Sequence, residues 1–468
     1  MNLHRLLQAR AEAGKPVRMG LIGCGKFASM FMAQAPRTPG LHVVGIADLA
    51  PARARESLMR VGWPAEHFAA KSLGDAIDRG TTFVGSDATA LIAHPAIDVI
   101  VEATGHPPTG LAHALHAFAA RKHVVMVTVE ADALAGPLLA RKAAEAGVVY
   151  SLAFGDQPAL ICDLVDWART SGFDVVAAGR GHKWLPHYYT STPETVWGYY
   201  GLTPEQAQQG GMNPQMFNSF LDGSKPAIEC TAVANATSLT PPPDGLAFPP
   251  CSILDLPNVM RPAAEGGQLH HKGQVEVASS LERDGRPVPE DIRWGVWVVF
   301  EAHNDYVARC FREYGLQTDG TGRYACMYKR WHLIGLEVGI SVAAVALRGE
   351  PTGVATGFRA DAVATAKRAL KAGETLDGEG GYTVYGKLTP AERSLALGGL
   401  PLGLAHGLKL TRAVAEGAPL SWGDVDLSGL DGVLGDAVRF RREMEGLYGR
   451  NDEPAVLRAA TGGGSTRS

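Results

Sequence analysis

The chain has 468 residues, enough for two or three domains that each bury a core of their own. Its composition is that of a globular protein, with 46% hydrophobic and 20% charged residues. A net charge of −4 and a pI near 6.4 argue against nucleic acid or an anionic membrane as a partner, so any phosphate site has to be local.

Cysteine usage and the N-terminal stretch bear on the cellular compartment. Six cysteines are scattered without a CxxC pair, which argues against a disulfide framework and a thiolate zinc site. The N-terminal stretch MNLHRLLQARAEAGKPVR predicts a short basic helix without the apolar core of a secretion signal. The most apolar stretch, residues 334–347, is too short to cross a bilayer and carries Glu337, so it predicts a buried helix. These features favour a reduced, cytoplasmic protein.

The stretch RMGLIGCGKFASMFMAQAP predicts a short apolar strand, a glycine-rich turn and a helix. Gly23 permits a tight turn, and Gly25 lets the backbone approach a pyrophosphate. The helix that starts here offers unpaired N–H groups and the positive end of its dipole to the anion. The pattern predicts a dinucleotide-binding loop made of Gly23, Gly25, Lys26, Phe27 and Ala28.

A second strand, LHVVGIAD, ends in Asp48, where the ribose-binding carboxylate of dinucleotide-binding folds lies. Asp48 favours the free 2′-hydroxyl of NAD and would repel the 2′-phosphate of NADP. Arg53 and Arg55 lie close enough downstream to bind that phosphate if the loop turns back. The sequence therefore leaves the choice between NAD and NADP open.

Three further strands are predicted, each ending where a cofactor would lie: 97–105, 122–128 and 147–155. Helical stretches separate them, and this alternation is typical of a parallel sheet. The sequence thus predicts a Rossmann domain. The alternative is a cofactor-free α/β domain whose glycines only serve a tight turn.

After residue 155 the chain changes to loops with aromatic and polar clusters, which predicts a substrate domain. Residues 174–189 predict a strand followed by a glycine-rich exit that carries Arg180, His182, Lys183 and His187. Fixed cations beside a nucleotide crevice suit a phosphate or carboxylate of a substrate. The alternative is a solvated loop with Trp184 packed beneath it.

The stretch MFNSFLDGSKPAIE spaces four polar residues at helical intervals: Asn218, Asp222, Lys225 and Glu229. On one continuous helix they would share a face. Gly223 and Pro226 make that helix doubtful, so we expect one helix to end near Asp222 and another to start at Ser224. The junction allows the polar groups to converge on a substrate; capping and surface ion pairs are the alternative.

Residues 293–303 and 305–314 predict two strands of an antiparallel sheet. A later strand delivers Lys329, Arg330 and His332 to the start of the buried helix. His332 is there a candidate acid or base, or else a structural histidine. Oxygen ligands for a divalent ion are present in Asp222, Glu229 and Glu337, but no tight motif supports a metal site and none is predicted.

Two segments near the C-terminus, 364–380 and 409–427, share a pattern of a basic residue, an apolar pair, small residues and a glycine-containing turn. They resemble the two halves of a SAF-type (β-clip) domain, with turns at Ala372-Gly373-Glu374 and Glu416-Gly417-Ala418. Such domains usually cover or regulate a neighbouring site. From about residue 441 the chain becomes charged and ends in TGGGSTRS, which predicts a frayed tail.

The expected fold class is therefore α/β. We expect a Rossmann dinucleotide-binding domain, an α+β substrate domain with an antiparallel sheet, and a small β-rich SAF-like domain. The expected boundaries are 1–155, 156–350 and 351–440, followed by a tail over 441–468.

Three stretches of the first domain resemble homoserine dehydrogenase: GLIGCGKFA, VIVEATG and VVMVTVEADALAG. The last departs from that family, because Glu130, Ala131 and Asp132 stand where its motif has a lysine. The whole chain, with GRGHKWLP, NPQMFNSFLDGSK and RWHLIGLEVGIS, resembles the DRL family over roughly residues 5 to 440. These bacterial enzymes are similar in activity to 1-deoxy-D-xylulose 5-phosphate reductoisomerase but have a homoserine-dehydrogenase-like fold.

The resemblance implies an NAD(P)H-dependent enzyme that isomerises a ketose phosphate and reduces the product, a step of isoprenoid precursor synthesis. It implies that the nicotinamide lies near Thr104, Gly105 and Glu130. A divalent metal is compatible with this chemistry but has no motif in the sequence.

The resemblance also implies candidate roles in the substrate domain. Lys183 or Arg330 would hold the phosphate, and Lys225 would polarise the carbonyl. Asp222 or Glu229 would serve as base. The catalytic candidates are completed by Asn218 and His332.

Two other functions stay open. An NAD(P)-dependent dehydrogenase of a sugar acid, polyol or homoserine-like substrate would use the same cofactor site. A non-catalytic nucleotide sensor would bind the cofactor without turnover and meet a partner through the SAF-like domain. We expect a small phosphorylated or acidic sugar-derived ligand, no nucleic-acid or membrane partner, and a homo-oligomer by analogy with related two-domain dehydrogenases.

Overall fold

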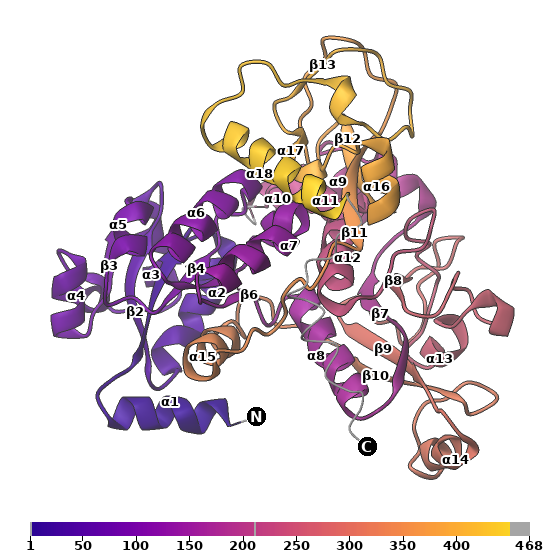
Figure 1. The fold of residues 1–468 in the computed structure, drawn as a ribbon, viewed down its shortest axis with the longest axis horizontal. Coiled ribbons are helices and arrows are strands. Elements are labelled where there is room, and N and C mark those ends of the chain that lie inside the picture. Colours follow the sequence, from indigo (N-terminus) through magenta and orange to yellow (C-terminus); the bar gives the residue numbers. More distant parts are fainter. Residues whose placement is uncertain (1, 210–211, 450–468) are drawn as a thin grey trace, which may run out of the picture.

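The computed structural model of the chain describes residues 2–209 and 212–449 (Figure 1). The predicted tail from residue 450 onward lies outside these residues. A layer of strands and helices lies on the left of Figure 1, a second sheet on the right, and a β-rich C-terminal region at the top. Among the helices of the described residues, none combines the length and apolarity needed to cross a membrane.

The first sheet is parallel and confirms the predicted Rossmann domain. Its strands are β1 (Val17–Ile22), β2 (Leu41–Ala47), β3 (Phe83–Gly85), β4 (Val99–Glu102), β5 (His123–Met126) and β6 (Tyr150–Leu152). They lie in the order β3-β2-β1-β4-β5-β6, which is that of a doubly wound dinucleotide-binding sheet. Their apolar side chains are buried on both faces, as is usual for parallel strands. The sequence did not predict β3, whose three residues are too few to show a pattern.

Helices cover both faces of this sheet. On one side, α6 (Pro107–Ala119) and α7 (Val129–Glu145) pack against each other. On the other side lies α15 (Gly339–Arg348), which contacts β1, β4, β5 and β6 although it comes much later in the chain. This helix confirms the buried helix predicted over 334–347, with a later start. The remaining helices of this region are α1 (Leu3–Glu12), α2 (Lys26–Gln34), η1 (Ala35–Arg37), α3 (Pro51–Arg60), η2 (Ala65–Phe68), α4 (Leu73–Arg79) and α5 (Ala88–Ala93).

The second sheet is mixed, whereas the sequence predicted an antiparallel one. Its strands are β7 (Asp174–His182), β8 (Gln274–Ser279), β9 (Val296–Glu301) and β10 (Tyr324–Lys329), in the order β10-β9-β7-β8. Strand β9 runs antiparallel to both β7 and β10, but β8 runs parallel to β7. A parallel neighbour needs a long crossover, and the chain between β7 and β8 supplies it.

Residues 305–314, predicted as a strand, form the helix α14 (Asp305–Glu313) instead. The Asn304 side chain accepts a hydrogen bond from the Val307 N–H at 2.9 Å and caps the helix. Val307 and Phe311 are four residues apart and face the core together. The helical spacing and the cap outweigh the strand-like composition.

The predicted break in the stretch 216–229 is confirmed. Helix α11 (Pro214–Leu221) ends at Asp222, and α12 (Ser224–Thr237) begins after Gly223, whose φ is +87°. Helix α12 is buried almost throughout, because it packs against α7, against α8 (Gln157–Thr170), and against the C-terminal strands. It therefore lies where the three regions of the protein meet.

The C-terminal region contains two small antiparallel sheets, formed by β11 (Ala360–Ala366) with β12 (Val384–Pro390) and by β13 (Lys409–Leu410) with β14 (Val425–Asp426). The two repeated segments lie side by side, because Leu370 and Val414 exchange backbone hydrogen bonds of 2.8 and 3.0 Å. Each expected turn has its glycine at positive φ, +83° at Gly373 and +73° at Gly417.

Residues 441–448, where the predicted tail begins, form the last turns of α18 (Gly432–Tyr448). This helix packs on α6 and α7 (Figure 1). The buried Arg441 guanidinium lies 2.6 Å from Asp361 Oδ2 and ties the helix to β11. The expected domain boundaries stay a prediction.

The remaining short helices of the described residues are η3 (Pro186–Thr190), α9 (Val196–Tyr200), α10 (Pro204–Gln209), α13 (Leu256–Val259), η4 (Ala263–Glu265), α16 (Ala391–Leu397), α17 (Leu402–Ala405) and η5 (Trp422–Asp424).

Candidate active site

The glycine-rich loop between β1 and α2 has the shape that a dinucleotide requires. A Cβ at Gly23 would lie 2.6 Å from the Ala103 carbonyl oxygen, and the φ of Gly23 is +88°, so only glycine fits there. A Cβ at Gly25 would meet no heavy atom within 4 Å, which leaves open space in front of the helix. Gly25 is the N-cap of α2, and no side chain caps that helix. The N–H groups at this helix start therefore fit a pyrophosphate.

Asp48 follows β2 and is fixed beside this loop. Its Oδ2 accepts a hydrogen bond from the Cys24 N–H at 2.7 Å, and its Oδ1 accepts one from the Ala50 N–H at 2.8 Å. Of the two downstream arginines, Arg55 donates to the Val84 carbonyl at 2.7 Å, and Arg53 is exposed. The structure thus holds a carboxylate where a ribose would bind. Among the described residues, neither Arg53 nor Arg55 forms an ion pair with Asp48.

A buried glutamate that the sequence did not single out shapes the ends of β4 and β5. The Glu102 carboxylate accepts a hydrogen bond of 2.5 Å from the Thr128 hydroxyl and one of 3.3 Å from the Thr104 N–H. The Thr128 hydroxyl in turn accepts the Gly105 N–H at 3.0 Å. This network fixes the turn at which the nicotinamide is expected. A carboxyl at the end of the apolar stretch VIVEATG was the available signal.

Lys225 and Glu130 form an ion pair that joins α12 to the first turn of α7. Burial disfavours the Lys225 ammonium, but neighbouring carboxylates outweigh this effect and raise its pKa. These carboxylates belong to Glu130, Glu379 and Asp156. A charged ammonium therefore lies at the junction between the cofactor domain and the substrate domain.

Two candidate residues lie in the interior behind this junction. Glu229 is paired with Arg180 of β7, and both side chains are buried. Burial lowers the pKa of Arg180 to about 10. The ring of His182, whose Nε2 lies 2.6 Å from the Phe220 carbonyl oxygen, is kept neutral, because burial and then the Arg180 charge hold its pKa well below the usual value.

Asp222 and Asn218 are also buried, and their polar atoms are engaged. Asp222 Oδ2 lies 2.7 Å from Lys367 Nζ, and its Oδ1 accepts the Ser224 N–H at 2.8 Å. Burial still raises the pKa of Asp222. Asn218 Oδ1 accepts the Ser191 hydroxyl at 2.6 Å, and its amide donates to the carbonyls of Ser191 and Gly380 at 3.0 and 2.9 Å. Both side chains thus hold the C-terminal region against α11.

Lys183 and Arg293 form a positive patch near Tyr200. Lys183 Nζ donates to the Tyr199 carbonyl at 2.7 Å and lies 5.7 Å from the Tyr200 ring centroid. Burial and then the Arg293 charge lower the pKa of Lys183, which indicates that the two cations are close. Within residues 2–209 and 212–449, neither cation is paired with a carboxylate. The patch can therefore accept an anion. Arg293 was not among the sequence candidates.

His332 and Arg330 have separate surroundings. His332 Nδ1 lies 2.6 Å from the Trp294 carbonyl oxygen, so Nδ1 carries the hydrogen and the other ring nitrogen is left as an acceptor. Burial lowers the pKa of His332, while the Trp294 carbonyl and the Asp156 carboxylate oppose this effect. Arg330 lies 2.5 Å from Glu290 in a partly exposed ion pair. His332 therefore lies near the charges of Asp156 and Arg180, whereas Arg330 lies at the surface.

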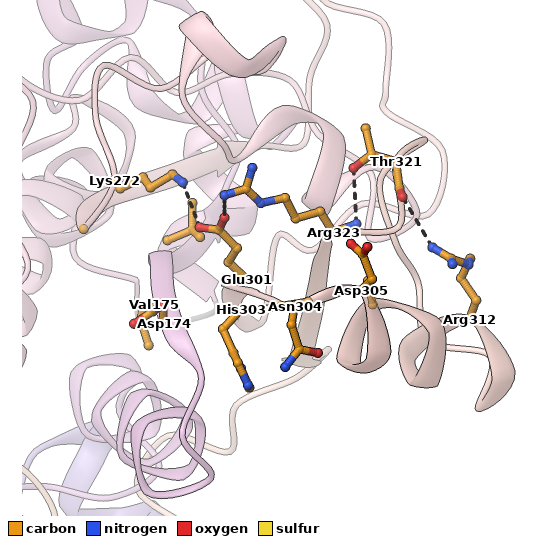
Figure 2. A pocket seen from close by; sticks show the side chains of 14 residues that line it. Asp174, Val175, Lys272, Glu301, His303, Asn304, Asp305, Arg312, Thr321 and Arg323 are labelled. Atoms are coloured by element: carbon orange, nitrogen blue, oxygen red, sulfur yellow. Dashed lines mark hydrogen bonds and ion pairs between the residues drawn. The ribbon is translucent and has the colours of Figure 1, made fainter.

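One hollow of the protein lies away from the candidate site residues. A hollow of about 1090 Å³ lies at the opposite end of β7 from Arg180, around Asp174 (Figure 2). Figure 2 shows Lys272 and Arg323 both directed at Glu301, which they neutralise. The hollow is lined by none of the candidate site residues described above. In the part of the chain that the structure describes, no group of three or more His, Cys, Asp or Glu side chains is arranged to hold a metal ion.

Solved structures match the chain at low identity. The oxidoreductase yvaA from Bacillus subtilis is 12% identical, with 71% of this chain and 89% of that chain covered and a TM-score of 0.34. Levoglucosan dehydrogenase in complex with NADH is 17% identical over 67% and 66% of the two chains, with a TM-score of 0.31. A homoserine dehydrogenase from Thiobacillus denitrificans is 17% identical over 48% and 49%, with a TM-score of 0.33. No curated protein sequence matches the chain.

Two family models match the chain in succession. Residues 17–131 match the oxidoreductase family with an NAD-binding Rossmann fold, a range that runs from β1 into the first turn of α7 and contains the glycine loop. Residues 155–338 match the oxidoreductase DRL catalytic domain, a range that contains Lys183, Lys225 and His332. The glycine loop, the parallel sheet and these two matches together show an oxidoreductase with an NAD(P)-binding Rossmann domain, followed by a domain that is similar to the DRL catalytic domain.

Proposed function

We propose that the chain uses NAD(P)H to reduce a small carbonyl substrate that carries a phosphate, as in reductoisomerase-like members of the DRL family. The observation that supports this proposal is the Lys183–Arg293 patch, which has no carboxylate partner among the described residues. Two unpaired, partly buried cations are costly unless an anion binds between them. A phosphate monoester is the anion that best uses both.

The first domain would hold the cofactor through the loop Gly23–Ala28 and through Asp48. The bound nicotinamide would supply the hydride. Thr104 and Gly105, fixed by Glu102 and Thr128, would border its ring. In this arrangement the nicotinamide would lie near the Lys225–Glu130 pair.

Lys225 is proposed to polarise the substrate carbonyl. Its ammonium stays charged because neighbouring carboxylates raise its pKa, and Glu130 fixes its direction. A fixed positive charge stabilises the negative charge that develops on the carbonyl oxygen. This role agrees with the one expected from the family resemblance.

The proposed base differs from the expected one. Asp222 and Glu229 are buried and paired with Lys367 and Arg180, so we propose positioning roles for both. His332 offers a neutral ring nitrogen without a hydrogen-bond partner in the described residues. We therefore propose that His332 takes the proton from the substrate hydroxyl during isomerisation.

The test is the oxidation of NADPH and, separately, NADH by the purified protein with 1-deoxy-D-xylulose 5-phosphate, with and without magnesium or manganese. Turnover of the phosphorylated ketose, but not of the free sugar, is expected.

Lys183→Ala and Arg293→Ala should each raise KM for the phosphorylated substrate about tenfold or more, with a smaller change in kcat. Each substitution removes an interaction that stabilises the bound substrate and the transition state equally. Arg330→Ala, which removes a surface ion pair, is the matched control.

Equal turnover of the phosphorylated and free sugars would contradict the phosphate assignment. A sugar acid is the second candidate, because a carboxylate also satisfies the Lys183–Arg293 patch. Oxidation of a sugar acid with NAD⁺, without turnover of any ketose phosphate, would favour that dehydrogenase. Tight cofactor binding without turnover of either class would favour a nucleotide sensor.

A further inference from the structure

A segment of the C-terminal region, residues 377–381, is clamped against α11 of the substrate domain. Gln215 Nε2 donates hydrogen bonds to the carbonyls of Asp377 and Glu379 at 3.1 and 2.9 Å. Asn218 Nδ2 donates to the Gly380 carbonyl at 2.9 Å. The segment is therefore fixed next to the candidate site, although it lies about 160 residues after the helix that holds it.

Gly380 makes this close contact with the helix possible. Its φ is +69°, and a Cβ there would lie 2.1 Å from the Gln215 carbonyl oxygen. On the other side of the segment, Lys367 Nζ donates to the Gly381 carbonyl at 2.7 Å. With both sides fixed, the backbone of the segment that carries Glu379 has little freedom.

Glu379 lies near the Lys225–Glu130 pair. Its carboxyl is close enough to Glu130, Lys225 and Asp222 for their charges to act on it. These groups come from α7, α12 and α11, which are the elements packed around the segment. The Asp222 charge is balanced by Lys367, and Asp156 acts on Lys225 from the start of α8.

Three other carboxylates of this junction each form an ion pair with a cation of their own. Glu130 is paired with Lys225, Asp222 with Lys367, and Glu229 with Arg180. No lysine or arginine of the described residues forms an ion pair with Glu379. Burial and then the Glu130 charge raise the pKa of Glu379 to about 8, despite Lys225 and Ser219. At neutral pH it therefore carries a proton, and the group of Glu130, Lys225 and Glu379 is neutral.

We propose that Glu379 is a catalytic residue of the reduction and donates the proton to the carbonyl oxygen that Lys225 polarises. This inference rests on the proposed function. As the carbonyl carbon gains a hydride, the O–H bond of the Glu379 carboxyl breaks and a new O–H bond forms on the substrate oxygen. Glu379 is left as a carboxylate beside the Lys225 ammonium, and a proton from water restores it.

Glu379→Gln tests the assignment directly. Glutamine keeps the size of the side chain but has no acidic proton. We expect kcat to fall on the order of 10²–10⁴-fold, with the Kd for NAD(P)H unchanged within about twofold. In the parent protein kcat should fall above about pH 8, and this basic limb should disappear in the variant. Glu374→Gln, which changes a carboxylate of the same region paired with the exposed Arg368, is the matched control.

A substrate-independent measurement keeps failure of the inference apart from failure of the proposed function. In protein with ¹³C-labelled glutamate and bound NADP⁺ or NAD⁺, one side-chain carboxyl should titrate near pH 8, and its signal should be absent in Glu379→Gln. Without such a carboxyl the inference is wrong, whatever the substrate. If the carboxyl titrates near pH 8 but the protein reduces no carbonyl compound, the proposed function is wrong, and the proton-donor role of Glu379 is then wrong as well.

Glu379→Asp separates the donor role from a structural one. Aspartate retains an acidic proton about one methylene further from the substrate, so partial activity and a basic limb should return. If the aspartate and glutamine variants lose activity equally and both lose cofactor affinity, Glu379 only holds the segment in place and the proposal is overturned.

Discussion

The Lys367 ammonium lies 2.7 Å from Asp222 Oδ2 in a fully buried ion pair between the C-terminal region and the junction of α11 and α12. The same Nζ donates to the carbonyls of Ser191 and Gly381 at 2.8 and 2.7 Å. These three partners satisfy the three N–H groups of the ammonium. The pair thus fixes the position of the segment that carries Glu379.

Lys367→Met should destabilise the protein strongly. It leaves Asp222 buried without its cation, and breaking a buried pair in this way costs about 3–5 kcal/mol. Urea unfolding followed by circular dichroism measures the change. Lys371→Met, at an exposed position in the same region, should stay within about 0.5 kcal/mol. Equal stability of the two variants would show that Asp222 is neutral or finds another partner.

Asp132 should make stability depend on pH. Its carboxyl is fully buried in α7 and accepts a hydrogen bond from the Tyr150 hydroxyl at 3.0 Å. Burial raises its pKa from 3.8 to about 7. Between about pH 4 and 7 the folded state therefore holds a proton that the unfolded state has lost, so this contribution is complete at low pH and disappears as pH rises.

The measurement for Asp132 is urea unfolding from pH 4.5 to 7.5. Asp132→Asn should reduce the fall in stability over this range relative to the parent protein. Asp166→Asn, at an exposed position, should leave the pH dependence unchanged. Identical slopes for Asp132→Asn and the parent would mean that Asp132 ionises normally in the folded protein.

Asp48 should make NADH bind more tightly than NADPH, by about tenfold or more. Two backbone N–H groups fix its carboxylate, so it cannot move away from a 2′-phosphate. Asp48→Ser removes the repulsion and should narrow the ratio of the two dissociation constants. Fluorescence titration with each cofactor measures it, and Arg53→Ala, an exposed neighbour, should have little effect on NADH. Tighter binding of NADPH by the parent protein would contradict the prediction.

Features set by short stretches of chain could be predicted from the sequence. The glycine loop, the buried strands and the helix break at Gly223 all follow from residues within one turn or one strand. The strand predicted over 305–314 was wrong, because its aromatic and β-branched residues hid the Asn304 cap and the helical pair of Val307 and Phe311.

Partners far apart in the chain could not be predicted. Lys367 reaches Asp222, and Glu379 reaches Lys225, across about 150 residues, and no local pattern specifies either contact. Arg293 lies near Lys183 only because β9 pairs with β7. The same holds for the parallel pairing of β8, which depends on the long crossover that precedes it.

The place of α15 has a consequence for synthesis of the chain. Its residues Val342 and Val345 share one apolar cluster with Met19 of β1 and Val101 of β4. Until residue 348 has left the ribosome, the part of that face over β4, β5 and β6 lacks this helix, and its apolar side chains meet water or another chain. The N-terminal third of the protein therefore depends on a helix made much later, and a nascent chain that pauses between them exposes an aggregation-prone surface.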